Sequence, residues 1–212
     1  MTTPAFNSYV TLDAAGMPTS TAYKLLTGIV VPRPIAWIST CDGAGLVNVA
    51  PFSSFNYVAH DPPMLAVNIN AHDDGRLKDT ARNIRETGEF VVNMTPRAAL
   101  DQMNASSAEY PPDASEAEHV GIPTLASTAV RPPRIALSPA QMECRLVQAV
   151  PLGSGVNTLY IGQVAVFHLD GAVYDGRHVD SAAIDPVARL GGPFYAALGE
   201  ILRRPRPTVP EK

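Results

Sequence analysis

The sequence predicts one mainly β domain, a β-barrel with helical decoration. Short apolar runs of strand length recur along the chain, whereas only a few stretches have a helical period. Proline makes up 20 of the 212 residues and clusters between the apolar runs. Because proline cannot donate to a strand ladder, this placement marks the ends of strands. The length fits one large domain or a domain with extensions.

The elements follow one another in a simple order. Residues 1–18 are polar and form an arm, and the domain spans 19–200. Glycines at 43 and 45 supply a hairpin turn after the first long strand. Residues 201–212 form a Pro/Arg-rich tail. The expected strands are 35–40, 46–50, 64–69, 90–94, 134–137, 141–150 and 158–169, and the expected helices are 21–26, 76–87, 97–107 and 113–120.

The helix expected at 76–87 has the clearest period. Leu77, Ala81 and Ile84 fall at i, i+4 and i+7, and Gly88 can end the helix. Arg76 and Lys78 then stand at its start. Free N–H groups and the helix dipole favour an anion there, so this start is a candidate phosphate site.

Composition excludes several classes of protein. Sixteen Lys and Arg against 20 Asp and Glu give a net charge of −4, which argues against a nucleic-acid binder. There is no apolar run long enough for a membrane span, and no secretory signal is visible. The cysteines, Cys41 and Cys144, are far apart and are read as unpaired thiols in a reducing cytoplasm.

Common catalytic motifs are absent. The five histidines show no metal-ligand spacing, so no metal site is expected. Neither a GxSxG nucleophile elbow nor a Gly-rich phosphate loop occurs. Instead, polar residues gather at three strand ends, in residues 32–40, 48–56 and 68–80. Each could be an ordinary turn, but together they offer donors, cations and a flat aromatic to a ligand with a phosphate, a polyol and a planar ring.

These segments resemble the flavin reductase-like family of FMN-binding split barrels, which includes flavoredoxin and reductase components of two-component monooxygenases. The resemblance covers roughly residues 20–195. It rests on the order and spacing of residues 33–40 (RPIAWIST), 48–56 (NVAPFSSFN), 61–63 (DPP), 78–84 (KDTARNI), 87–93 (TGEFVVN) and 189–192 (RLGG).

The resemblance implies a six-stranded Greek-key split barrel, a homodimer, and FMN near the subunit interface. It places Arg33 close to the flavin, lets Arg189 close the pocket, and leaves residues 104–133 as an insert that shapes substrate access. The ribityl chain and ring would be lined by Ser39, Thr40, Ala50, Pro51, Ser53, Ser54 and Phe55. The phosphate end would be served by Asn68, Arg76, Lys78, Asp79 and Thr80.

The implied activity is hydride transfer from NADH or NADPH to FMN, with reduced flavin passing electrons to oxygen, a partner monooxygenase or a bound substrate. Such transfer needs no catalytic acid or base from the protein, because the cofactor carries the chemistry. The alternative is a tightly FMN-binding electron carrier or flavin store without NAD(P)H activity. An FMN enzyme that reduces an organic substrate directly is a third reading. The lone tryptophan, Trp37, is read as a core aromatic rather than a flavin contact.

Overall fold

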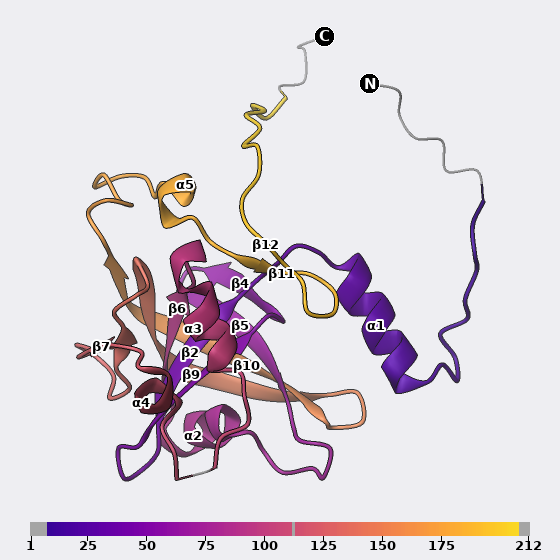
Figure 1. Ribbon diagram of the computed structural model, residues 1–212, viewed down its shortest axis with the longest axis horizontal. Coiled ribbons are helices and arrows are strands. Elements are labelled where there is room, and N and C mark those ends of the chain that lie inside the picture. Colours follow the sequence, from indigo (N-terminus) through magenta and orange to yellow (C-terminus); the bar gives the residue numbers. More distant parts are fainter. Residues whose placement is uncertain (1–7, 112, 208–212) are drawn as a thin grey trace.

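The computed structural model describes residues 8–111 and 113–207, which are built around one antiparallel sheet of seven strands. The strand order is β3-β2-β6-β9-β10-β5-β4. Strands β3 and β5 lie close together although most of the sheet separates them in that order, so the sheet curls into a barrel (Figure 1). The strands are β2 (Ala36–Cys41), β3 (Val47–Phe52), β4 (Phe55–His60), β5 (Pro63–Asn70), β6 (Glu89–Met94), β9 (Ala140–Leu152) and β10 (Asn157–Leu169).

Short elements decorate the barrel. Strands β1 (Arg33–Pro34), β11 (Ala188–Arg189) and β12 (Tyr195–Ala196) form a separate sheet, and β7 (Thr124–Leu125) pairs with β8 (Arg134–Ile135). Within the described ranges, no helix has the length and hydropathy needed to cross a bilayer. The helices are α1 (Thr19–Ile29), α2 (Asp79–Thr87), a 3-10 turn (Arg97–Ala99), α3 (Leu100–Ala105), α4 (Glu116–Val120) and α5 (Ser181–Ile184).

Buried apolar side chains form two clusters. The first unites β2, β5, β6, β9 and β10 with the inner face of α2 and includes Ile84, Phe90 and Tyr160. The second lies around Trp37, which is fully buried and donates its indole N–H to Ser106 Oγ, 3.0 Å away. The expected role of Trp37 as a core aromatic is confirmed. Cys41 and Cys144 are buried and unpaired, also as expected.

Helix α2 begins later than the sequence predicts. Lys78 has an extended backbone (φ −63°, ψ 152°), so Asp79 is the first helical residue. The backbone N–H of Arg76 is instead held by Asp74 Oδ1 at 3.0 Å. The predicted end is correct, because Gly88 adopts a left-handed conformation (φ 71°) that only glycine takes without strain.

Other boundaries also differ from expectation. Strand β4 was not expected, because most of its side chains are exposed at the edge of the sheet and its sequence has no apolar run. With β4 the main sheet has seven strands rather than six. The helix expected at 97–107 divides into a 3-10 turn and α3, the helix at 113–120 shortens to α4, and the first helix lengthens to α1. Part of the expected arm and tail, residues 1–7 and 208–212, lies outside the described residues.

A buried carboxylate anchors the long connection between β6 and β9. Glu143 is fully buried and accepts backbone N–H bonds from Thr128, Ala129 and Val130 at 2.7, 2.5 and 3.1 Å. His168 Nε2 lies 2.6 Å from its Oε1. Burial alone would raise the pKa of this carboxyl, but the surrounding donors hold the pKa of Glu143 at about 2.

Helix α1 stands apart from the barrel, beside the small sheet of β1, β11 and β12 (Figure 1). None of its residues is buried. Tyr23, Leu26 and Ile29 are exposed by 62%, 63% and 73%. So many exposed apolar side chains are unusual on a helix whose surface faces only water. This surface therefore indicates a site of interaction with a partner.

Candidate functional site

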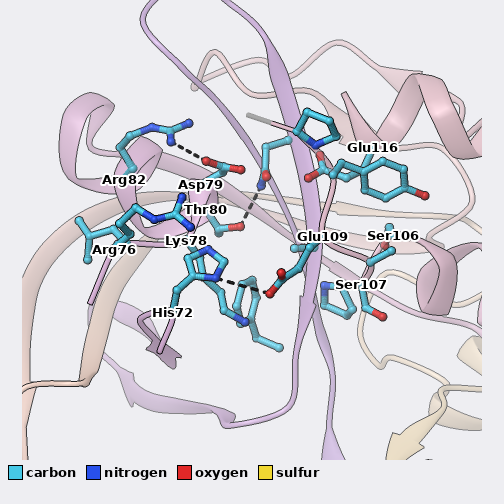
Figure 2. Close-up of a pocket in the computed structure, with 18 residues that line it drawn as sticks. His72, Arg76, Lys78, Asp79, Thr80, Arg82, Ser106, Ser107, Glu109 and Glu116 are labelled. Carbon is cyan, nitrogen blue, oxygen red and sulfur yellow. Dashed lines mark hydrogen bonds and ion pairs between the residues drawn. The ribbon is translucent and has the colours of Figure 1, made fainter. Parts of the chain in front are cut away.

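A cavity of about 850 Å³ opens beside the start of α2. Figure 2 shows its walls, which come from three parts of the chain. They are strand β3, the segment from His72 into α2, and residues 106–111 together with Glu116. The third wall lies inside the 104–133 insert, so this insert borders the cavity.

Lys78 occupies the position just before α2. Its side chain lines the cavity and makes no hydrogen bond or ion pair with any other residue that the structure describes. The first backbone N–H groups of α2 have no carbonyl partner within the helix. An unpaired ammonium beside a helix N-terminus favours an anion. A phosphate suits such a position because it is negatively charged and its oxygens can accept several of these N–H bonds.

The two arginines nearby are already paired. Arg76 Nε lies 2.6 Å from Asp74 Oδ2, and its side chain is 71% exposed. Arg82 lies 2.5 Å from Asp79 Oδ1. Arg76 and Asp79 both line the cavity, but each already has a local partner, and their contact with a phosphate stays a prediction. Lys78 is therefore the cation best placed to take a ligand.

A buried network of amides and hydroxyls supports the start of α2. Asn48 Nδ2 donates to Thr80 Oγ1 at 2.8 Å and to Thr40 Oγ1 at 3.3 Å, and Asn83 Nδ2 donates to Thr40 Oγ1 at 3.1 Å. All four residues are buried. Asn48 and Thr80 border the cavity, whereas Thr40 lies behind them. Because Thr80 accepts from Asn48, its own hydroxyl proton remains available to a ligand.

The side of the cavity on β3 is largely apolar. Ala50, Pro51 and Phe52 follow one another there, and Leu77 lines the cavity just before α2. The sequence predicts flavin contacts at Ala50 and Pro51, and the structure brings both to the cavity that Lys78 enters. Planar rings pack well against apolar surfaces of this kind.

The cavity also contains a carboxyl group that sequence reasoning did not place in the site. Glu116 is 6% exposed and accepts the backbone N–H of Val49 at 3.0 Å through Oε2. Burial is the main cause of its raised pKa, and the charge of Asp79 adds to it. His72 and Glu109 line the cavity as well and were also missed. The acidic residues of the insert were the available signal, but only the fold shows that they meet α2.

Several predicted site residues lie outside the cavity lining. Ser39 is buried and donates its hydroxyl to the carbonyl of Pro133. Ser53 and Ser54 form the turn between β3 and β4, next to the cavity-lining end of β3. The carbonyl of Ser54 accepts the backbone N–H of Asn68 at 2.8 Å.

Two more of the predicted residues lie on the neighbouring strands β4 and β5. Phe55 packs against the first core cluster. Asn68 Oδ1 is buried and has no hydrogen-bond partner among the described residues. The contact of Ser39, Ser53, Ser54, Phe55 and Asn68 with a flavin stays a prediction.

Arg33 and Arg189 make structural contacts around the small sheet within a single chain. Arg33 donates to the carbonyls of Thr27 and Val30 at 2.6 Å each and of Leu190 at 2.9 Å, so it caps the end of α1. The guanidinium of Arg189 lies 4.5 Å from the centre of the Tyr195 ring and bonds to the Tyr195 hydroxyl. Neither side chain lines the cavity, and their predicted contact with flavin remains a prediction.

Known proteins resemble this chain along most of its length. A curated relative, the uncharacterised protein YwrF of Bacillus subtilis (strain 168), is 41% identical over 192 residues, covering 88% of this chain and 93% of YwrF. Component B of nitrilotriacetate monooxygenase from Bacillus cereus has 34% identity and a TM-score of 0.90, covering 93% of this chain and all of that one. The 2-nitrobenzoate 2-nitroreductase NbaA of Pseudomonas fluorescens has 31% identity and a TM-score of 0.86, covering 95% and 99%.

These similarities confirm the split-barrel fold that the sequence resemblance implies. The family model described as "Flavin reductase like domain" matches residues 28–183, which include β1 to β10, α2 and the whole cavity lining. The chain therefore belongs to the flavin reductase-like domain family, a family of flavin-linked oxidoreductases.

Proposed function

We propose that the protein binds FMN in the cavity beside α2 and reduces it with NADH or NADPH. The observation that carries this proposal is the unpaired ammonium of Lys78 at the N-terminus of α2, in a cavity whose β3 side is apolar. The phosphate and the flat ring of one ligand can use both features at once.

The residues present fit FMN part by part. Lys78, the hydroxyl of Thr80 and the free N–H groups of α2 would hold the phosphate. Pro51 and Phe52 would support the ring, and Ser53 and Ser54 lie where the chain leaves this surface. The volume of about 850 Å³ lies in the range of small-molecule sites and leaves room for a second planar group.

The bound flavin would supply the redox chemistry by accepting a hydride and passing its electrons on. The protein's own residues would bind the flavin, orient its ring and tune its electronic properties. Lys78 offsets the negative charge of the phosphate, and the apolar side of β3 excludes water from one face of the ring. Donors at Ser53 and Ser54 would stabilise negative charge that develops at the ring edge on reduction. No side chain is required as an acid or base in the hydride step.

The electron acceptor is proposed from the relatives. The similarity to component B of a monooxygenase favours delivery of reduced flavin to a monooxygenase partner. The similarity to a 2-nitrobenzoate 2-nitroreductase favours a second candidate function, direct reduction of an aromatic substrate on the same flavin. The space beside the ring would serve a nicotinamide in the first case and alternate between nicotinamide and substrate in the second.

We further propose that the working form is a homodimer. The exposed apolar side chains of α1, together with the exposed Phe194, Ile201 and Leu202 near the end of the chain, are the support for this. A second copy would cover these surfaces and would bring the region of Arg33 and Arg189 against its partner, and a two-fold axis is the commonest way to close such an assembly.

Anaerobic mixing of the FMN-loaded protein with NADH or NADPH tests the proposed function. Loss of the visible flavin absorption in step with nicotinamide oxidation supports reductase activity. Tight FMN binding without reduction by either nucleotide would leave the electron-carrier alternative. Reoxidation of the reduced protein by a nitroaromatic compound, compared with reoxidation by oxygen alone, separates the two candidate acceptors.

A further inference from the structure

A contact between two polar side chains joins the wall of the cavity that leads into α2 to the wall formed by the insert. Among the described residues, Glu109 Oε1 lies 3.5 Å from His72 Nδ1 across the space between these walls (Figure 2). His72 follows β5, whereas Glu109 follows α3. Both side chains line the cavity.

Glu109 differs from the other carboxylates at this end of the cavity. Asp74 and Asp79 pair with arginines two and three residues away, so each pair belongs to a single local turn. Glu109 reaches its partner from a separate segment, and its side chain is 82% exposed. It can therefore leave without disturbing the backbone that carries Lys78.

The charge of Glu109 acts on more than His72. The pKa of Arg76 is raised, first by its hydrogen bond with Asp74 and in smaller part by the charge of Glu109. The carboxylate thus contacts His72 and lies within electrostatic reach of Arg76, and both of these residues line the same cavity as Lys78. A phosphate group carries up to two negative charges near neutral pH and would be drawn to the same side chains.

We propose that Glu109 is an internal competitor for the phosphate end of this cavity, and that His72 is a further phosphate ligand. In the free protein Glu109 holds His72. When FMN binds at Lys78, its phosphate repels Glu109 and takes over the bond from His72. This inference rests on the proposed function, and it explains how a protein with a built phosphate site can still release its flavin to a partner.

The test compares flavin affinities of the full-length protein, measured by titration without any nicotinamide. The variants are Glu109→Gln, His72→Gln and the double variant, with FMN and riboflavin as ligands. Glu118→Gln is the matched control, because Glu118 is an exposed residue of the same insert outside the cavity lining. An exposed charge pair is worth little, so Glu109→Gln should tighten FMN by about two- to fivefold and leave riboflavin unchanged.

His72→Gln should weaken FMN binding in both backgrounds and leave riboflavin unchanged. Equal tightening of FMN and riboflavin by Glu109→Gln, no tightening at all, or the same effect from Glu118→Gln would overturn the competitor role. Unaltered FMN affinity in His72→Gln would overturn the ligand role. If these shifts appear but NADH and NADPH fail to reduce the flavin, the inference stands and the reductase proposal fails. A wild-type protein that binds neither flavin would overturn both the inference and the proposed function.

Discussion

Asn48 on β3 donates its side-chain amide to the hydroxyl of Thr80 in the first turn of α2, across 2.8 Å. This bond ties the sheet to the helix that presents Lys78 to the cavity. Both residues are buried, so water competes little for this bond.

Replacing Asn48 by Ala removes this bond and the longer one to Thr40. We expect urea titration to show a free energy of unfolding lower by about 1–3 kcal/mol, the usual cost of leaving buried hydrogen-bonding partners unsatisfied. FMN binding should also be weaker. Asn56→Ala is the control, since Asn56 is exposed and its side chain bonds only to the adjacent backbone N–H. Wild-type urea stability and FMN affinity in the Asn48 variant would show that the network does not position α2.

Ser53 and Ser54 test how the ring edge is held. The double change to Ala should preserve the fold and some FMN binding, because both residues lie in a turn outside the barrel core. Loss of donors at the ring edge should slow reduction by NAD(P)H and lower the reduction potential of bound flavin. Stopped-flow absorbance and a dye-equilibrium potential measure both. Wild-type rate and potential would instead make the serines structural and leave ring recognition to backbone groups.

The ionised side chain of Glu143 makes stability depend on pH. Its pKa is about 2 in the folded protein against an ordinary value of 4.5, so its stabilisation is full above about pH 4.5 and is lost as the pH falls towards 2. The shift corresponds to about 3 kcal/mol. The free energies of unfolding of wild type and Glu143→Gln, measured in urea, should therefore differ most at pH 7 and become similar in acid. Glu200→Gln, an exposed control, should follow the wild type. A difference that does not change with pH would contradict this role.

The strands and α2 were largely predictable because their signals are local. Leu77, Ala81 and Ile84 lie at helical spacing, and the apolar runs of β2, β5 and β6 are bounded by prolines and glycines. Strand β4 was missed because an exposed edge strand has no such run. The meeting of Lys78 and Thr80 at one cavity was predictable because they are near neighbours in sequence and stay together at a helix start.

The insert's share of the cavity was not predictable in the same way. Glu109 and Glu116 meet the start of α2 only because a long connection folds back over β3. No spacing in the sequence encodes that return. Arg33 and Arg189 show the converse, because a motif residue can be held by structural hydrogen bonds within one chain and lie outside the cavity lining.

The exposed face of α1 leads to a prediction on assembly. Sedimentation at micromolar concentration should give a mass near twice the 22.5 kDa of the chain. Replacing Leu26 and Ile29 together by Glu should shift the protein towards the monomer, because it would place charges in an apolar contact. Lys24→Glu, on the same helix, is the control for a change of charge alone. A wild-type monomer with bound FMN would contradict the dimer proposal.

Lys78→Ala tests whether the phosphate of FMN lies at the start of α2. FMN and riboflavin are titrated into wild type and variant, with Lys24→Ala as a matched lysine control far from the cavity lining. We expect Lys78→Ala to weaken FMN binding by about 1–3 kcal/mol, the cost of losing a hydrogen bond to a charged group, while riboflavin binds as before. Equal losses for the two flavins, or no loss for either, would contradict it.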